Sequence, residues 1–244
     1  MESELMEVFA TLPQQGPGSD EVGRRVLGSL KESLPASPEI ADFGCGTGRS
    51  TFLLADAFPR GRICGIDLNS EFCAVLATGI ETRGLSGRVS VLNRDMLRSG
   101  LYTGSLDLIW SEGAAYTVGF DNALSCWHEL LAQDGLCVVS ECEWLRMDAP
   151  KEIRDYWAAL YPGMRTTEEN RRRARLLGFD AIDHVVLPAE AWEAYHEPLL
   201  EALSGRENLH AALVEIGRER QMIRRYNKYF GYALHVLKRC STVG

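Results

Sequence analysis

The sequence lacks several features that would mark an extracellular, membrane or zinc-binding protein. Its seven cysteines are an odd number, and no two of them form a C-x-x-C pair, so neither a disulfide framework nor a zinc site is indicated. No stretch approaches the roughly 20 apolar residues of a membrane-spanning helix. Residues 1–12 carry three glutamates and no basic start, unlike a secretory signal. We therefore expect a cytoplasmic protein with reduced thiols, no metal and no membrane partner.

An excess of basic residues is also missing. The formal net charge is -8 and the isoelectric point is about 5.2, so the overall field repels phosphate backbones and makes nucleic acid an unexpected partner. A chain of 244 residues with 45% hydrophobic residues can bury one substantial core. We expect one domain, and a homodimer is possible.

Short apolar runs alternate with helical patterns along the first part of the chain, which is typical of βαβ units and a parallel sheet. The predicted strands are residues 39–43, 62–66, 89–93, 106–111 and 135–141, and the clearest helices between them are 50–58, 70–83 and 122–131. The carboxyl ends of such strands share one edge of the sheet, where ligands gather. The fold class is therefore α/β, Rossmann-like and doubly wound.

The pattern changes after Cys142. Helices are predicted at 149–161 and 166–177, then a strand at 179–187, two helices at 189–203 and 207–226, and a closing strand at 229–237. These helices are insertions between strands five and six and between strands six and seven. We divide the single domain into a helical cap (1–34), a cofactor-binding core (35–142) and an acceptor side (143–244).

A glycine-rich turn, Asp42-Phe43-Gly44-Cys45-Gly46-Thr47-Gly48, follows the first strand and opens a helix. Glycines at this turn let a ligand approach the backbone. The dinucleotide fingerprint would need a third glycine where the chain has Arg49, and no Lys-Ser or Lys-Thr pair completes a phosphate loop. The turn favours a ligand other than a nicotinamide dinucleotide or a nucleoside triphosphate.

Two acids end the next two strands. Asp67 can accept hydrogen bonds from both ribose hydroxyls, and Asp95 can accept from an adenine amine while Met96 packs on the base. Together with the turn they predict an adenosine-shaped slot. The alternative is that the turn is a plain strand-to-helix connection and that both acids are helix caps.

With D-F-G-C-G-T-G, G-I-D-L and N-R-D-M in this order, the chain resembles the class I S-adenosylmethionine-dependent methyltransferases. It resembles more closely a small bacterial branch grouped with the ubiquinone and menaquinone biosynthesis methyltransferases, through Q-G-P-G-S at 15–19, W-S-E-G-A at 110–114 and S-E-C at 140–142. The resemblance implies a seven-stranded sheet with an antiparallel last strand.

The resemblance also implies S-adenosyl-L-methionine as cofactor, with S-adenosyl-L-homocysteine as product. The three glycines would face its methionine part, Asp67 the ribose and Asp95 the adenine, while Asp42 would order the loop or meet the amino group. Residues 15–19 would form a lid. The predicted cofactor-binding residues are Gln15, Gly16, Ser19, Asp42, Gly44, Cys45, Gly46, Gly48, Asp67, Leu68, Asp95, Met96 and Ser111.

Methyl transfer is an in-line displacement, so most of the catalysis can come from holding the acceptor about 3 to 3.5 Å from the methyl carbon. Acid–base help matters only for an acceptor that arrives protonated. The chain lacks the N/D-P-P-Y motif of enzymes that methylate nucleic acid or protein amides. A small-molecule acceptor is therefore expected.

Acids and aromatics at the fourth and fifth strand ends predict the acceptor pocket. Glu112, Glu141 and Glu143 come from these ends, and carboxylates within aromatic walls suit a cationic or amine acceptor. We expect Glu112 or Glu141 to orient or deprotonate an amine or hydroxyl acceptor. The predicted walls are Trp110, Tyr116, Trp144, Trp157 and Tyr161, although Trp157 and Tyr161 also fit a helix core and Glu143 a surface charge. The predicted catalytic residues are Glu112, Glu141, Tyr116 and His196, and His196 has a structural role as its alternative.

Three other functions compete with this interpretation. A NAD(P)-dependent oxidoreductase is disfavoured by Arg49 and by the Asp95-Met96 pair. A non-catalytic S-adenosylmethionine-binding module would lack an acceptor cavity. A metal-dependent O-methyltransferase would need a convergent Asp/Asn triad, which the sequence does not assemble.

Overall fold

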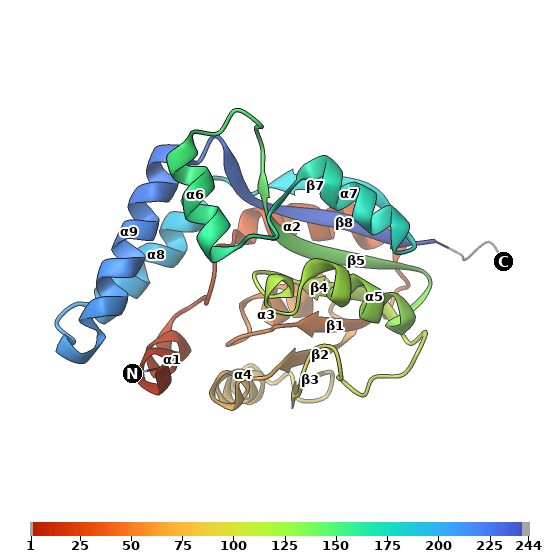
Figure 1. The fold of residues 1–244 in the computed structure, drawn as a ribbon. Coiled ribbons are helices and arrows are strands. Elements are labelled where there is room, and N and C mark those ends of the chain that lie inside the picture. Colours follow the sequence, from red (N-terminus) through yellow and green to blue (C-terminus); the bar gives the residue numbers. More distant parts are fainter. Residues whose placement is uncertain (1, 241–244) are drawn as a thin grey trace.

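A sheet of mostly parallel strands forms the centre of the computed structural model, which describes residues 2–240 (Figure 1). Its strands lie in the order β3-β2-β1-β4-β5-β8-β7, and β8 runs antiparallel to both of its neighbours. The bounds are β1 Glu39–Phe43, β2 Arg62–Asp67, β3 Val89–Asn93, β4 Leu106–Ser111, β5 Leu131–Trp144, β7 Phe179–Val186 and β8 Phe230–Arg239. The predicted doubly wound fold with an antiparallel last strand is confirmed.

Two details of the sheet differ from the prediction. A two-residue strand, β6 (Arg165–Thr166), pairs with the end of β5, and so short a segment has no periodicity to announce it. β5 also begins at Leu131 rather than at 135, with Asp134 at a φ of 62°. This left-handed residue lies among polar side chains, so the sequence there resembles a loop.

Helices cover both faces of the sheet. α2 (Asp20–Leu30), α3 (Arg49–Ala57) and α4 (Ser70–Thr82) pack on one face, and α5 (Phe120–Leu130) and α7 (Thr167–Leu176) on the other. Each face therefore has its own apolar core, which explains why the central strands read as continuous apolar runs.

The remaining helices stand beyond one end of the sheet. α6 (Lys151–Leu160), α8 (Glu190–Leu203) and α9 (His210–Tyr226) lie together, with α1 (Glu2–Thr11) near them (Figure 1). Val8 of α1 and Leu12, just after it, pack with Tyr195, Leu199 and Leu203. Short 3-10 turns complete the chain at η1 (Lys31–Ser33), η2 (Ala115–Thr117) and η3 (Glu207–Leu209).

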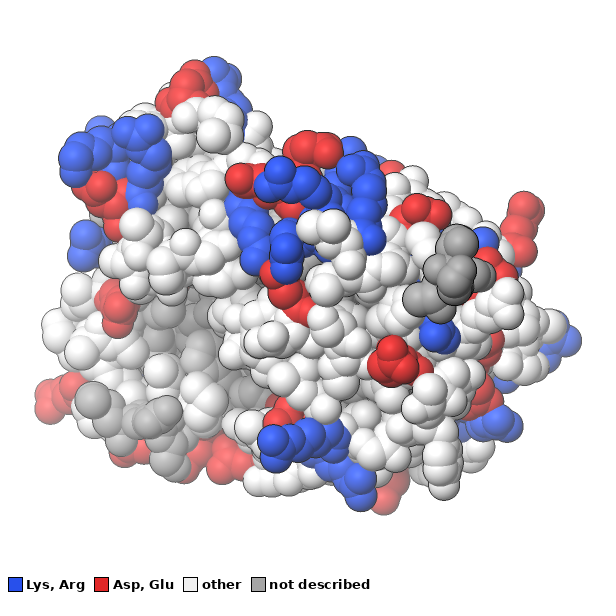
Figure 2. All heavy atoms as spheres, turned by 45° about the vertical axis from the view of Figure 1, so that its right-hand side comes forward, with Lys and Arg blue, Asp and Glu red and all other residues white. Residues whose placement is uncertain are grey.

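The charged side chains of both signs lie at the surface of the face drawn in Figure 2, where Lys and Arg gather toward the top beside acidic residues. The basic helix α7 contributes to the ion pairs, since Arg173 binds Asp121 of α5. None of the helices within residues 2–240 has the length and apolar character needed to cross a membrane.

Candidate active site

The glycine turn after β1 forms the floor of a cleft of about 270 Å³. Gly44 and Gly46 have φ values of 71° and 53°, a region in which a side chain is strained. A Cβ on Gly44 would lie 2.1 Å from the Ala114 side chain, and one on Gly46 2.3 Å from Gln15 Oε1. Both positions therefore need glycine, and both present bare backbone to the cleft.

The two strand-end acids line the same cleft. Asp67 accepts a hydrogen bond from the Gly46 amide at 2.9 Å, and so it joins β2 to the glycine turn. Its other oxygen accepts from the Asn69 amide at 2.9 Å. Asp95 accepts from the Leu97 amide at 2.8 Å. Each carboxylate is thus fixed by backbone donors, with lone pairs left for a ligand.

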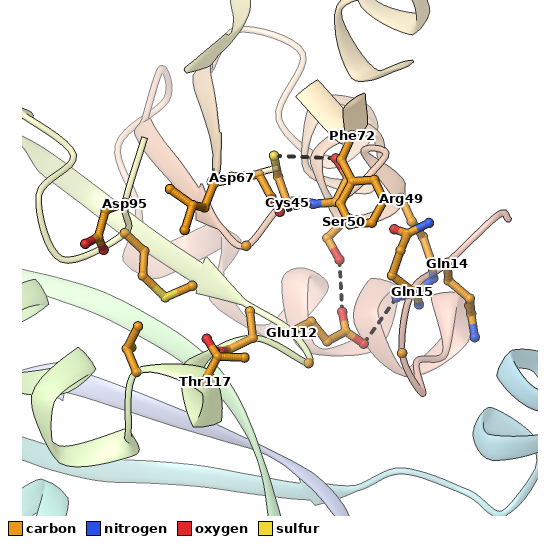
Figure 3. Close-up of a pocket in the computed structure, with 18 of the residues that line it drawn as sticks. Gln14, Gln15, Cys45, Arg49, Ser50, Asp67, Phe72, Asp95, Glu112 and Thr117 are labelled. Atoms are coloured by element: carbon orange, nitrogen blue, oxygen red, sulfur yellow. Dashed lines mark hydrogen bonds and ion pairs between the residues drawn. The ribbon is translucent and has the colours of Figure 1, made fainter. Parts of the chain in front are cut away.

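A charged group closes the opposite end of the cleft (Figure 3). Glu112, at the end of β4, accepts hydrogen bonds from Ser50 at 3.1 Å and from the Trp110 indole at 3.2 Å, and it pairs with Arg49 at 3.3 Å. Asp20 also binds Arg49. Within residues 2–240, Glu112 Oε1 and Arg49 Nη2 are buried without a hydrogen-bond partner. An anionic and a cationic site therefore lie side by side.

The segment between α1 and α2 covers the glycine turn. Gln15 accepts a hydrogen bond from the Thr47 amide at 3.2 Å and donates to the Phe9 and Leu12 carbonyls at 3.0 and 3.1 Å. Gly16 lines the cleft as well. The Gln15 side chain thus ties α1 to the glycine turn.

The structure divides the remaining predicted cofactor residues into two groups. Cys45, Leu68 and Met96 line the cleft. Four others do not: Ser19 caps α2 by accepting from Val22, Asp42 is buried behind the turn, Gly48 starts α3 against Leu76, and Ser111 is buried in β4.

Asp42 orders the turn from behind. Its carboxyl accepts a hydrogen bond from the Thr51 hydroxyl of α3 at 2.6 Å, and burial raises its pKa to about 7. The first of its two predicted roles, ordering the loop, suits this position.

A second cavity of about 200 Å³ adjoins the cleft and is walled by aromatic rings. It shares Gln15, Gly16, Pro17 and Gly113 with the cleft, so this aromatic chamber and the cleft adjoin at these four residues. The rings come from Tyr116 of η2, Trp157 of α6, Tyr161, Trp192 and Tyr195 of α8, and Tyr232 of β8.

Among the predicted wall residues, Tyr116, Trp157 and Tyr161 line the aromatic chamber. Trp110 lies in the core on the α2–α3 face, and Trp144 packs on Phe230. Whether a strand residue lines the chamber depends on the face of the sheet toward which its side chain points. Its position at the end of a strand does not reveal that face.

The acids behave differently from one another. Glu141 is 1% exposed, and burial raises its pKa to about 7, while the neighbouring Tyr161 hydroxyl favours the ionised form.

Glu219 of α9 lines the aromatic chamber and binds the buried His196 at 3.2 Å. His196 itself does not reach the chamber wall, so its position fits the structural alternative.

Glu143 is neither a surface charge nor part of the acceptor wall, because it is fully buried. One oxygen accepts from Thr167 and His184, both at 2.6 Å, and the other from His235 at 2.9 Å and Asn170 at 3.1 Å. These hydrogen bonds lower its pKa to about 2 against the opposing effect of burial. The cluster of Glu143 and the two histidines could also hold a metal ion, but the carboxylate already accepts four hydrogen bonds. We interpret it as a buried link between α7, β7, β8 and β5.

Sequence reasoning missed several residues that line the two cavities. They are Arg49, Ser50, Phe72, Thr117 and Glu219. Arg49 and Ser50 directly follow the glycine turn, so their place at the start of α3 was an available signal. Glu219 lies on a helix with many charged residues, and nothing in that pattern distinguishes it.

Comparisons with known proteins agree with this geometry. Residues 40–135 match the family model of a methyltransferase domain. A malonyl-[acyl-carrier protein] O-methyltransferase of Coxiella burnetii is 32% identical over 43% of this chain and 40% of its own length. A trans-aconitate 2-methyltransferase of Streptomyces avermitilis is 35% identical over 42% of this chain and 38% of its own. The matched segment thus spans about two fifths of these relatives.

The fold also matches a solved structure. A SAM-dependent methyltransferase from Thiobacillus denitrificans, in complex with S-adenosyl-L-homocysteine, has a TM-score of 0.79 at 18% identity, over 95% of this chain and 96% of its own. The similarity in fold therefore extends beyond residues 40–135 to nearly the whole chain.

Proposed function

We propose that the protein belongs to the methyltransferase domain family, whose model its residues 40–135 match, and that it uses S-adenosyl-L-methionine to methylate a small molecule held in the aromatic chamber. The observation that carries this proposal is the junction of two cavities. The cleft offers a bare glycine floor and two fixed acids, and the aromatic chamber opens beside it. A module that only binds the cofactor would not need the second cavity.

The residues of the cleft fit the cofactor. Gly44 and Gly46 have no room for a side chain against Ala114 and Gln15, so the floor of the cleft is bare backbone. Asp67 suits the ribose hydroxyls, and Asp95 suits the adenine amine with Met96 beside it. Figure 3 places Asp67 and Asp95 toward one end and Arg49 and Glu112 toward the other. The cleft is therefore polar at both ends, as an amino acid joined to a nucleoside requires.

We assign Glu112 to the amino-acid end of the cofactor rather than to proton transfer. Its Oε1 pairs with Arg49 Nη1 at 3.3 Å, but neither this oxygen nor Arg49 Nη2, both buried, has a hydrogen-bond partner within residues 2–240. An ammonium group can donate to the first while a carboxylate accepts from the second, which removes two unsatisfied polar atoms. This arrangement leaves Glu141 as the remaining candidate base.

The acceptor class is an amine or a hydroxyl. When bound, the cofactor supplies an electrophilic methyl group. The chain's own residues hold the acceptor against the junction and exclude water with Tyr116, Trp157 and Tyr161. With a pKa raised to about 7 by burial, Glu141 can take a proton that leaves the acceptor through the Tyr161 hydroxyl.

The names of two relatives point to acidic acceptors, and the residues around the aromatic chamber argue against an acid here. Among the described residues that line it, none is Lys, Arg or His, and Glu219 is present. A carboxylate acceptor would be placed near another carboxylate with no cation to neutralise it.

Calorimetric titration with S-adenosylhomocysteine, and with NADH as control, tests the cofactor. A screen of amines, phenols, thiols and carboxylic acids, read by release of S-adenosylhomocysteine, tests the activity. Binding of S-adenosylhomocysteine with methylation of an amine or hydroxyl supports the proposal. Binding of NADH alone would overturn it.

The division of the chain into a cap, a core and an acceptor side belongs to the same proposal, as does a cytoplasmic location. All seven cysteines are free, which suits a reducing compartment. The homodimer stays a prediction.

A further inference from the structure

The aromatic chamber has the composition of a site for a compact cation. Six rings from four helical or strand elements and the residue after α6 surround it. Tyr116 and Tyr161 meet edge to face with ring centroids 6.2 Å apart, and Trp192 and Tyr232 lie 5.2 Å apart. The faces of such rings attract positive charge, most strongly where water is excluded.

Among the residues of 2–240 that line this cavity, Glu219 is the only one with a carboxylate. His196 donates to its Oε1 at 3.2 Å, and His196 is fully buried, packed on Trp192 and Tyr195. The carboxylate is therefore held from behind. Its Oε2 makes no hydrogen bond within residues 2–240, and its side chain is 23% exposed.

The charge also reaches the rings. Burial and, after it, the Glu219 charge raise the pKa of Tyr116 and of Tyr195. The two hydroxyls therefore remain protonated at neutral pH and can act as donors, while the negative charge of the cavity stays on Glu219.

We propose that the aromatic chamber recognises a small amine with a compact, alkylated nitrogen, and that Glu219 and the rings around it stabilise the positive charge that this nitrogen gains on methylation. The inference rests on the proposed function and names its acceptor class. The nitrogen lone pair forms the new N–C bond while the S–C bond of the cofactor breaks and its electron pair returns to sulfur. A neutral tertiary amine becomes a quaternary ammonium, and a neutral secondary amine releases one proton to Glu141 after it is methylated. A tertiary amine that enters protonated must first give its proton to Glu141 through the Tyr161 hydroxyl, which frees the lone pair.

Charge moves from sulfur to nitrogen in this step, so a carboxylate beside the nitrogen binds the transition state more tightly than the neutral amine. A hydroxyl acceptor would gain less stabilisation from Glu219, because the loss of its proton leaves the methylated oxygen without a positive charge. An amine uses both the rings and Glu219.

Three probes of similar size separate the alternatives: choline, its uncharged isostere 3,3-dimethylbutan-1-ol, and 3,3-dimethylbutanoate. Each is titrated calorimetrically into the full chain saturated with S-adenosylhomocysteine. We expect choline to bind about tenfold more tightly than the alcohol, and the anion more weakly than both. Equal or tighter binding of the alcohol or the anion would overturn the inference.

Variants locate the effect. Glu219→Gln should bring the ratio of choline to alcohol affinity close to one, while Glu215→Gln, an exposed acid on the same helix, should leave it at the wild-type value. Tyr116 is 44% exposed, so Tyr116→Leu tests the rings with little risk to folding, and it should weaken choline more than the alcohol. An unchanged ratio in both Glu219→Gln and Tyr116→Leu would refute the assignment.

The S-adenosylhomocysteine affinity of each variant is measured in the same series. If wild-type protein does not bind S-adenosylhomocysteine, the proposed function fails. If it binds S-adenosylhomocysteine but shows no preference for choline, only the acceptor class fails.

Discussion

Replacing Glu112 with Gln should weaken S-adenosylhomocysteine binding through its amino-acid end alone. Glu112 is held by Ser50, Trp110 and Arg49, and its buried Oε1 pairs with Arg49 but has no hydrogen-bond partner within residues 2–240. A glutamine keeps the size and the hydrogen bonding of one oxygen but loses the charge. The cofactor's ammonium group would then donate to a neutral amide or meet an amide NH₂.

Hydrogen bonds to charged groups contribute about 1.5–3 kcal/mol, so we expect the dissociation constant of S-adenosylhomocysteine to rise about 10- to 150-fold. The burial of the site supports the upper part of this range, since the Glu112 side chain is 4% exposed and little water can replace the lost interaction. Isothermal titration calorimetry measures the change directly.

The control for Glu112→Gln is a second ligand rather than a second variant. Methylthioadenosine carries the nucleoside and sulfur but no amino-acid end, so its affinity for the Glu112→Gln variant should stay within about twofold of wild type. Arg49→Lys should show the same selectivity, because a lysine has no fork to reach both Glu112 and a carboxylate. An equal loss for both ligands would mean that the variant distorts the cleft, and no loss for either would remove Glu112 from the cofactor site.

Three further predictions concern single residues. Gly46→Ala should weaken S-adenosylhomocysteine binding at least tenfold. The left-handed φ costs a residue with a side chain about 1–2 kcal/mol, and the alanine Cβ would lie 2.3 Å from Gln15 Oε1. Calorimetry measures the change, and wild-type affinity would contradict the prediction. For an amine substrate that releases a proton, activity should rise with pH through about 7, where Glu141 ionises, and Glu141→Gln should lose that inflection in a pH–rate profile. Glu143→Gln should lower the free energy of unfolding in urea by about 3 kcal/mol at pH 7, and the exposed Glu201→Gln is its control. Because the pKa of Glu143 is lowered to about 2, the difference in unfolding free energy from wild type should shrink as the pH falls from about 4.5 to 2. A difference that stays constant over this range would refute the role of the Glu143 charge.

The fold could be predicted because the hydrophobic pattern of the strands and the local start signals of the helices agree with each other. The central strands are buried on both faces and read as apolar runs, while α4 carries its own start signal in Asn69, which accepts from the Glu71 and Phe72 amides. Only local irregularities escaped, such as the left-handed Asp134 in β5. A single residue with an unusual φ leaves no periodic pattern.

The cofactor side of the site was accessible to sequence reasoning because its residues follow strand ends in order. Asp67 and Asp95 line the cleft as their positions suggest. The acceptor side was not accessible in the same way, because Glu219 comes from a helix more than 100 residues beyond Glu112 in the chain. Tertiary packing of α6, α8 and α9 brings its walls together, and that packing has no local signature. For the same reason Glu143 could not be recognised as a buried link to His184 and His235.

The charges around the two cavities favour the proposed amine acceptor over an acid. In amine methylation the positive charge only changes place, from a sulfur in the cleft to a nitrogen in the aromatic chamber, and each position has a nearby carboxylate, Glu112 or Glu219. In methylation of an acid the charges of cofactor and acceptor cancel, and the anion must first enter beside Glu219. At a separation of about 5 Å and an effective dielectric constant of about 20, that repulsion is about 3 kcal/mol, which corresponds to more than a hundredfold loss in affinity. Because no cation lines the chamber among the described residues, nothing in its wall offsets this cost, whereas the same carboxylate stabilises the positive charge that an amine gains as it is methylated.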